Sequence, residues 1–329
     1  MFEKKKKFRF NWNLAQRFVN DYRLPIPIMG ERMFKYHLNL YENKFGCKSK
    51  WLQLWDLIDQ RFGGNPEKFL EEFYRIREQV IQTVSTSEPF IAFNNCDMGV
   101  YPKVKLAPRC SSLYNEMNIG KKFVSIDLTK GNFQALNYVD RNILLNSGTY
   151  EEFISKFTDL YYIKESKYFR QVIFGKMNPK RHITVEEHLI GKVYNYIIER
   201  GVDPSTLVVA NSDELIFEIT DAATEFPVNE VGIALRVGAN VHIEEFTLRG
   251  YDFYSKKENH KRCTFYAKER RYASFKNAKS VELMCVPMPY HSIIFKLYHG
   301  IRPKKKDYHF VYENIDCIFN DKFYIKEIN

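Results

Sequence analysis

The sequence predicts an α+β protein, with a mainly helical N-terminal subdomain over residues 1–120 and an antiparallel sheet carrying helices on one face over residues 121–329. Two observations lead to this prediction. Apolar residues recur at helical spacing through the first hundred residues, whereas short apolar runs of strand length are frequent after residue 121. Of the 329 residues, 45% are hydrophobic and 16% aromatic, which is enough apolar surface to bury a core.

Three helices are predicted in the N-terminal subdomain. An apolar and aromatic stripe predicts the first over residues 31–46, and a second runs from about residue 50 to residue 62. The third begins with Asn65 as N-cap and Pro66 in the first helical position, and its apolar face continues to Val84. Pro89 is expected to end this helical block.

Helices and strands are both predicted after residue 121. Thr149 with Glu152, and Thr184 with Glu187, form capping boxes that open helices near residues 149–161 and from 184 to 200. Between these two helices, a further helix is predicted over residues 164–176. Strands are predicted at 122–128, 207–210, 215–219, 231–237, 240–248, 263–267 and 281–286.

Charge and cysteine content indicate the kind of environment and partner. The chain carries 50 Lys and Arg against 40 Asp and Glu, a formal charge of +10, which is compatible with a polyanion such as nucleic acid. The six cysteines are scattered without zinc-ligand spacing, as expected of thiols in a reducing compartment. No apolar stretch has the length of a membrane span, and the basic N-terminus lacks a signal-peptide core, so we expect an intracellular, cytoplasmic protein. The basic runs Lys4–Lys7 and Arg302–Lys306 are expected to be solvated, with at most non-specific affinity for phosphate.

Acidic residues at strand ends are the candidate chemistry. Asp127 ends the strand at 122–128, and a four-residue polar turn containing Asp213 and Glu214 joins two apolar runs, as in a hairpin. Carboxylates on neighbouring strands make a hard-oxygen site suited to Mg²⁺ or Mn²⁺. Two such ions, about 3.5–4 Å apart, are a common means of catalysing nucleotidyl transfer. The alternative is an ordinary solvated hairpin tip.

Three segments in this order resemble the palm motifs of a template-directed nucleic-acid polymerase. Residues 123–133 resemble motif A, residues 167–175 the motif B helix, and residues 207–219 motif C. The motifs mix features of family A and family B DNA polymerases. Motif C is close to the His-Asp-Glu-Leu form of family A, with Ser212 in place of His. The resemblance extends over about 121–220 and does not reach the N-terminal helices.

The resemblance implies roles for individual residues. Asp127, the Leu128 backbone carbonyl and Asp213 would hold two Mg²⁺ or Mn²⁺ ions, with Asp127, Asp213 and Glu214 as the catalytic carboxylates. The expected nucleotide-binding residues are Lys167 and Arg170 at the triphosphate, Phe174 and Gly175 under the new base pair, and Asn132 at the sugar 2′ position. The segment containing Lys261, Arg262, Tyr266 and Lys268 resembles the part of family B enzymes that holds the primer strand, although its pattern is also typical of an edge strand.

The function that follows is an exonuclease-free polymerase that extends a primer-template from nucleoside triphosphates, with DNA-directed DNA synthesis expected and room for an accessory protein. The small size suggests a virus or mobile element as its origin. Departures from the family patterns at Asn132, Arg170, Asn211 and Ser212 leave open a catalytically inactive palm-fold nucleic-acid-binding protein. The sequence is also compatible with a nucleotide cyclase, a primase-like nucleotidyltransferase, or a structural protein in which the motifs are coincidental.

Overall fold

The structure is a computed structural model that describes residues 8–220, 226–271, 279–313 and 315–328. The basic run Lys4–Lys7 therefore lies outside the described residues. The chain is α+β, which confirms the predicted fold class: helices come first, and a large antiparallel sheet follows. Within the described residues, no helix combines the length and apolar character needed to cross a bilayer.

The N-terminal part is helical, as predicted. Its α-helices are α1 (Trp12–Asp21), α2 (Glu31–Phe45), α3 (Cys47–Phe62), α4 (Pro66–Ser85) and α5 (Glu88–Asn95). The Asn65 side chain accepts a hydrogen bond from the Lys68 N–H at 3.1 Å, so the predicted cap is confirmed. The prediction that Pro89 ends the block is wrong. Ser87 caps α5, and Pro89 lies in its first turn, where a missing N–H breaks no helical hydrogen bond.

One antiparallel sheet organises the rest of the chain. Its strands are β1 (Lys122–Leu128), β2 (Leu207–Ala210), β3 (Glu214–Glu218), β4 (Val241–Ser255), β5 (Lys261–Arg271), β6 (Lys279–Met284) and β9 (Phe323–Ile328). They lie in the order β2-β3-β1-β4-β5-β6, and β9 pairs with β4. A separate hairpin joins β7 (His309–Tyr312) and β8 (Ile315–Ile318). The predicted strands at 122–128, 207–210, 215–219, 240–248, 263–267 and 281–286 are thereby confirmed in position.

The remaining helices are α6 (Gly131–Val139), α7 (Tyr150–Ser155), α8 (Tyr161–Glu165), α9 (Lys167–Gly175), α10 (Pro179–Glu199), α11 (Glu230–Val237) and α12 (His291–Tyr298). The helix predicted near 149–161 ends at Ser155, and the single helix predicted over 164–176 is interrupted at Ser166, between α8 and α9. Two further predictions are wrong. Thr184 does not cap a helix, because α10 already begins at Pro179 and the Thr184 hydroxyl donates to the Lys180 carbonyl at 3.3 Å. The predicted strand at 231–237 is helix α11, which Asn229 caps and Gly238 ends at φ +79°. A short apolar run is compatible with the periodicity of a helix and with that of a strand, so the capping residues decide which of the two forms.

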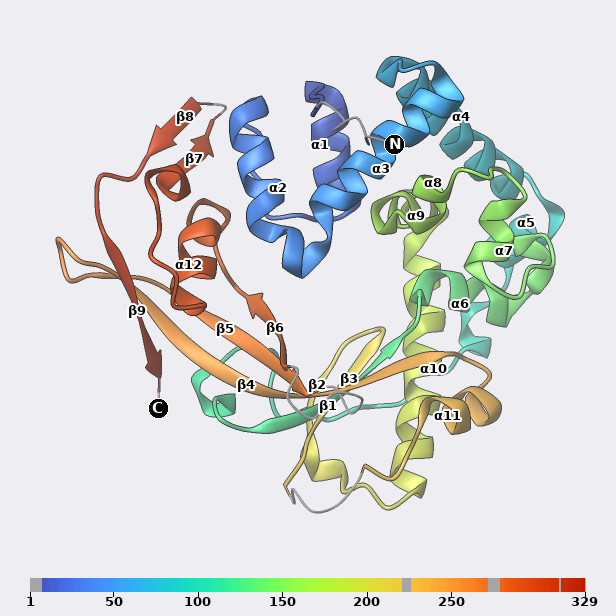
Figure 1. The fold of residues 1–329 in the computed structure, drawn as a ribbon. Helices are drawn as coiled ribbons and strands as arrows, with labels where there is room; N and C mark the ends of the chain where they lie inside the picture. Colours follow the sequence, from blue (N-terminus) through green and yellow to red (C-terminus); the bar gives the residue numbers. More distant parts are fainter. Residues whose placement is uncertain (1–7, 221–225, 272–278, 314, 329) are drawn as a thin grey trace, which may run out of the picture.

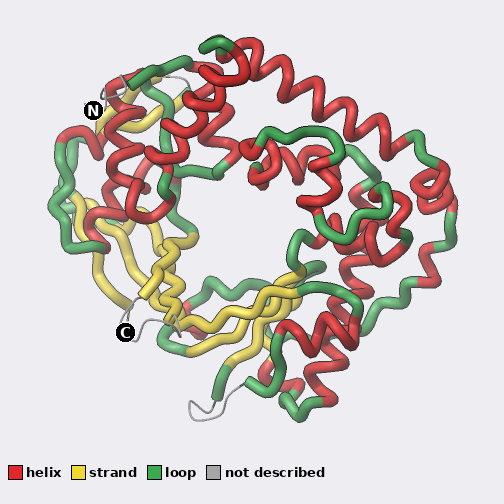
Figure 2. The backbone as a smooth tube through the Cα atoms, turned by 45° about the vertical axis from the view of Figure 1, so that its right-hand side comes forward, coloured by secondary structure: helices red, strands yellow, loops and turns green. Residues whose placement is uncertain are grey.

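The elements are arranged in a ring (Figures 1 and 2). The sheet forms one side, helices α4–α9 the next, helices α1–α3 the side opposite the sheet, and the C-terminal elements close the circuit. We call residues 288–328 without 314 the C-terminal module; it contains α12, β7, β8 and β9. A single buried cluster runs from Leu14 in α1 through β1 and β3 to Phe295 in α12, so the N-terminal helices share a core with the sheet.

Two buried polar contacts attach helices α1 and α2 to their neighbours. Asp21 at the end of α1 accepts hydrogen bonds from the hydroxyls of Tyr162 and Ser166, at 2.8 and 3.1 Å. On the other side of the ring, the Lys296 ammonium of α12 contacts both Asp307 and the Tyr36 hydroxyl of α2, each at 2.7 Å. The N-terminal helices therefore bridge α8–α9 and the C-terminal module.

Candidate functional site

The end of β1 meets the β2–β3 turn. Asp127 and Glu214 are directly opposite each other in the antiparallel register of β1 and β3. The Leu128 N–H donates to the Asp213 carbonyl at 2.8 Å, which fixes the end of β1 beside the turn. Asp213, in the turn just before β3, is thus brought beside the end of β1 that carries Asp127, although 86 positions separate these two acids of the palm motifs in the sequence.

Like charges gather at this point. Partial burial raises the pKa of Asp127 from 3.8 to about 6, and the Asp213 and Glu214 carboxylates contribute to the same upward shift. The Lys167 ammonium and His242, the residue opposite Asp127 on β4, act in the other direction. The pKa therefore reports an acidic cluster whose negative charge is only partly compensated by the chain itself.

A further buried carboxylate, at a position outside the palm motifs, lies near this turn. Glu186 on α10 is 4% exposed, and burial raises its pKa to about 7, with further upward contributions from Asp213, Glu187 and Asp127. Asn132 of α6 donates to the Glu186 carboxylate at 2.6 Å. The only sequence signal for Glu186 is a charged residue within the apolar stripe of the 179–199 helix, on the same face as Leu189, Ile190 and Val193.

Gly131 allows this close approach. A Cβ at residue 131 would stand 3.2 Å from the Glu186 carboxylate oxygen and 3.6 Å from the Asp213 Cβ. The preceding residue, Lys130, adopts φ +57° as it turns from the end of β1 into α6. The segment after motif A therefore passes between the β2–β3 turn and α10, and this is what places Asn132 against Glu186.

The motif B residues separate into two groups. Lys167 begins α9, and its positive charge acts to lower the pKa of Asp127. Arg170 turns to a different set of partners: its guanidinium lies 5.4 Å from the Tyr150 ring centroid, and burial lowers its pKa while Tyr150 and Glu151 raise it. The two cations do not converge on one group.

Phe174 is a core residue in this structure. Its side chain is fully buried, 6.3 Å from the Tyr150 ring centroid, 6.4 Å from Phe153 and 6.5 Å from Phe133. The expected role as a floor under a base pair therefore has no exposed ring face to support it. Gly175 differs, because it is exposed and a Cβ at that position would meet open space.

The four residues expected to hold a primer strand already have partners within the chain. The Lys261 ammonium pairs with Asp252 at 2.8 Å, and Arg262 pairs with Glu258 at 2.6 Å. Lys268 is 7% exposed, with its ammonium 4.7 Å from the Phe246 ring centroid, and Tyr266 is equally buried in the second core cluster. These side chains form no continuous exposed basic ridge.

The donor groups suit a hard divalent cation in kind. Asp127 and Asp213 offer carboxylate oxygens at neighbouring strand ends, which is the chemistry that Mg²⁺ and Mn²⁺ prefer. Glu214 is engaged instead, because its two oxygens accept hydrogen bonds from the Ser125 hydroxyl at 2.6 Å and the Asn211 amide at 3.3 Å. Among the residues that the structure describes, no three or more His, Cys, Asp or Glu side chains come together as a preformed metal site. The metal site that the palm resemblance implies is therefore not preformed among the described residues.

The raised pKa of Asp127 predicts a pH-dependent effect on stability. Since the folded pKa of about 6 exceeds the unfolded value of 3.8, ionising Asp127 costs folding free energy as the pH rises through this interval. In protein stripped of divalent cations, Asp127→Asn is expected to raise the midpoint of thermal unfolding at pH 8 by about a degree or two, because Asp127 is exposed and solvent screens part of the effect. The gain should vanish near pH 4, where Asp127 is largely neutral in the folded state. Scanning calorimetry of the two proteins across this range is the measurement, and an unchanged midpoint at pH 8 would show that ionising Asp127 costs the folded state nothing.

Comparison with known protein families, curated proteins and solved structures finds no match to this chain. Its function is therefore inferred from the residues and geometry of the site.

Proposed function

We propose that this protein is a palm-type nucleotidyltransferase that adds nucleotides to the 3′-hydroxyl of a nucleic-acid strand by two-metal-ion catalysis, with DNA-directed DNA synthesis as its activity. The observation that carries the proposal is the position of Asp127, near the end of β1, beside the β2–β3 turn that carries Asp213; the charge of Lys167 also acts on Asp127. The motif residues also lie on the element types that the palm resemblance requires: a strand end, a helix and a hairpin turn.

Each residue has a chemical task under this proposal. Asp127 and Asp213 would hold Mg²⁺ or Mn²⁺, which lowers the pKa of an attacking 3′-hydroxyl and neutralises the leaving pyrophosphate. The Lys167 ammonium adds positive charge where negative charge grows on the triphosphate. Glu186 holds Asn132 by a short hydrogen bond, so Asn132 is a fixed group rather than a free side chain at the incoming sugar.

Primer extension tests the proposal. A labelled primer on DNA and on RNA templates, offered deoxynucleoside or ribonucleoside triphosphates with Mg²⁺ or Mn²⁺, should lengthen with at least one combination. Extension on the DNA template with deoxynucleotides is the expected result. A wild-type protein that extends nothing under any combination would contradict the proposal.

A second candidate function is supported by the state of Glu214. This carboxylate is hydrogen-bonded to Ser125 and Asn211, so one of the three expected catalytic carboxylates already has its oxygens engaged within the chain. A palm-fold nucleic-acid-binding protein without catalysis would show this arrangement, and it would bind a primer-template but leave the primer unextended.

Lys167→Met is expected to lower kcat/KM for the incoming nucleotide about 10²-fold. Removing one fixed charge that stabilises the charge developing in a transition state typically lowers the rate by a factor of this size. Steady-state incorporation kinetics measure the effect. Lys176→Met is the matched control, since Lys176 is an exposed lysine immediately after α9. Equal kinetics for the two variants would remove Lys167 from the active site.

A further inference from the structure

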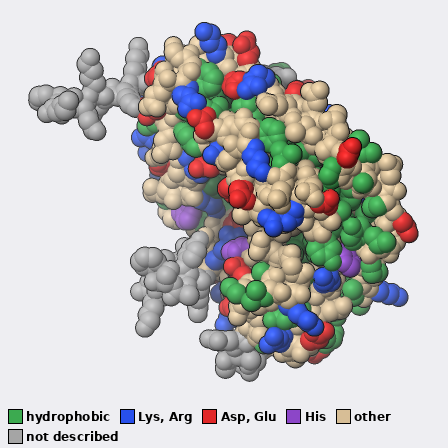
Figure 3. Space-filling view, turned by 90° about the vertical axis from the view of Figure 1, so that its right-hand side faces the viewer, with side chains coloured by type: hydrophobic (Ala, Val, Ile, Leu, Met, Phe, Trp, Pro, Cys, Tyr) green, Lys and Arg blue, Asp and Glu red, His purple; other side chains and the backbone are tan. Residues whose placement is uncertain are grey.

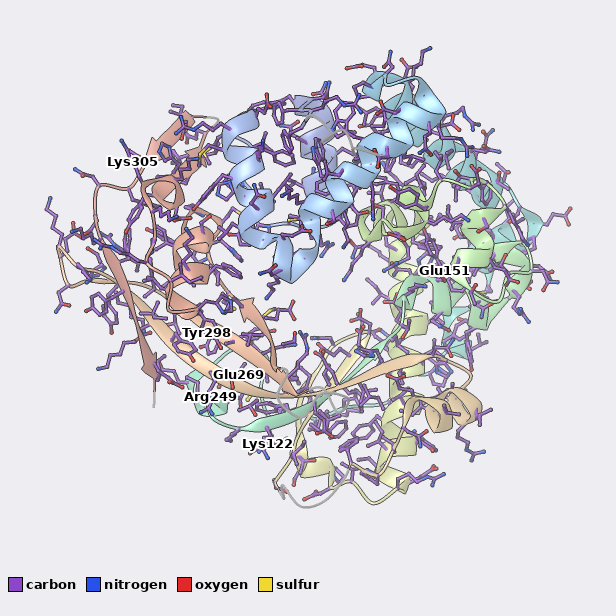
Figure 4. The ribbon with its side chains drawn as sticks, viewed as in Figure 1. Lys122, Glu151, Arg249, Glu269, Tyr298 and Lys305 are labelled. Carbon is purple, nitrogen blue, oxygen red and sulfur yellow. The ribbon has the colours of Figure 1, made fainter. Side chains whose placement is uncertain are left out.

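A large pocket opens between the C-terminal module and the β4–β5 turn, away from the acidic cluster. Its volume is about 1030 Å³, and its walls come from the β4–β5 turn, the loop that follows α12 and the segment that leads into β9. Figure 4 places Lys305 of this pocket and Glu151, whose partner Lys130 follows β1, on opposite sides of the ring. The pocket is therefore a separate feature from the proposed active site.

Positive charge dominates the walls of the pocket. Exposed cations line it from three separate segments: Lys256, Lys257, Arg302, Lys305 and Lys322. In the described part of the chain, none of them makes an ion pair with a carboxylate. The single acidic lining residue, Asp321, is engaged by the Ser255 hydroxyl and by the backbone N–H groups of Lys257 at 3.2 Å and Lys322 at 2.6 Å. The cations are thus left with uncompensated charge.

This concentration of one sign is not general over the surface. The face of the molecule in Figure 3, which carries the α4–α9 side, shows Lys and Arg interspersed with Asp and Glu. Many cations elsewhere are paired, as Arg61 is with Asp159 at 2.8 Å and Arg75 with Glu72 at 2.7 Å. The pocket is therefore a place where the net charge of +10 is available to an anionic ligand.

The floor of the pocket is apolar and aromatic. Tyr308, Phe319 and Phe323 line it, and Phe319 is stacked on Tyr290 and on Phe310 with ring centroids 4.8 and 4.2 Å apart. At the rim, Ile301 and Ile318 are 48% and 47% exposed. Large apolar side chains left open among cations indicate a ligand that combines negative charge with flat or apolar groups.

We propose that this pocket binds a segment of single-stranded nucleic acid, with its phosphates on the lysines and Arg302 and a base against the apolar floor. A single strand alternates phosphate charges with planar bases at short intervals, which is the combination that basic and aromatic grooves accept. An acidic peptide would satisfy the cations but would leave the floor and the exposed isoleucines uncovered. The inference goes beyond the proposed catalytic function, because the pocket can bind a strand whether or not the palm is active.

Fluorescence anisotropy with a labelled oligothymidylate of about twelve nucleotides tests this inference at several salt concentrations. The variant Lys257→Glu/Lys305→Glu reverses two pocket charges on different walls. Lys68→Glu/Lys105→Glu is the control with the same change in net charge, at exposed lysines outside the pocket. The pocket variant is expected to bind at least about tenfold more weakly, with the slope of log K against log salt reduced by about 1.4, because each cation on a single strand contributes about 0.7. The control variant should bind nearly as the wild type does.

Two results would overturn the inference: equal weakening by the pocket and control variants, or displacement of the oligonucleotide by polyglutamate of matched charge as readily as by unlabelled oligothymidylate. The assay is done without divalent cations, so that oligonucleotide binding is measured apart from any metal held by the aspartate pair. A protein that fails to extend primers yet loses binding with the pocket variant would refute the catalytic proposal and leave this one standing.

Discussion

Replacing Asp127 or Asp213 by asparagine is expected to reduce kcat for nucleotide incorporation by at least about 10³-fold, since each change removes a charge that holds a catalytic cation. Asparagine has nearly the same shape as aspartate, so the change removes charge with little change in packing. The hydrogen bond from the Leu128 N–H to the Asp213 backbone carbonyl is also kept, since it does not involve the side chain. Primer extension under single-turnover conditions measures the effect.

The controls for this experiment separate catalysis from charge and folding. Asp203→Asn removes an exposed carboxylate that caps a short 3-10 helix, a task asparagine performs equally well, so incorporation should not change. Glu214→Gln should have a smaller effect than either aspartate change, because Glu214 is already hydrogen-bonded to Ser125. Wild-type rates in Asp127→Asn or Asp213→Asn would refute the two-metal proposal.

Phe174→Ala is expected to destabilise the fold by about 3–5 kcal/mol, because truncating a fully buried aromatic ring leaves a cavity. The same position distinguishes core packing from nucleotide contact. Phe174→Leu keeps most of the volume, so it should retain most of the stability and leave kcat/KM within a few-fold of the wild type.

Urea unfolding and incorporation kinetics on the Phe174 variants give both readouts. Tyr74→Ala, at an aromatic residue that is 43% exposed, is the control and should change stability far less than Phe174→Ala. The core assignment fails if Phe174→Leu is as stable as the wild type but loses incorporation by orders of magnitude.

Local signals in the sequence predicted much of the fold. The start of α4 at Asn65 and Pro66 could be predicted from these two residues alone, because a capping side chain and the fixed φ of proline act within one helical turn. The hairpin around Asp213 was likewise predictable from two apolar runs and a polar turn. The run at 231–237 forms a helix in place of the predicted strand because seven mostly apolar residues suit both periods, and the Asn229 cap decides between them.

Contacts between residues that are distant in the chain could not be predicted from the sequence. Glu186 joins the acidic cluster only because α10 packs beside the end of β1 and Gly131 leaves room for its carboxylate. Arg170 and Phe174 share the motif B helix with Lys167, but the packing around Tyr150 draws them away from the acidic cluster. The pocket around Lys257 and Lys305 forms from segments almost fifty positions apart. Taken alone, the basic run Arg302–Lys306 therefore has the sequence pattern of an ordinary solvated segment and does not indicate a pocket.

Anomalous diffraction from crystals grown with Mn²⁺ and a non-hydrolysable nucleoside triphosphate tests the two-metal proposal most directly. We expect Mn²⁺ peaks between the Asp127 and Asp213 carboxylates, with the triphosphate on the Lys167 side, and the loss of these peaks in crystals of Asp213→Asn. Manganese bound elsewhere, or aspartates that stay without an ion while nucleotide is bound, would contradict it.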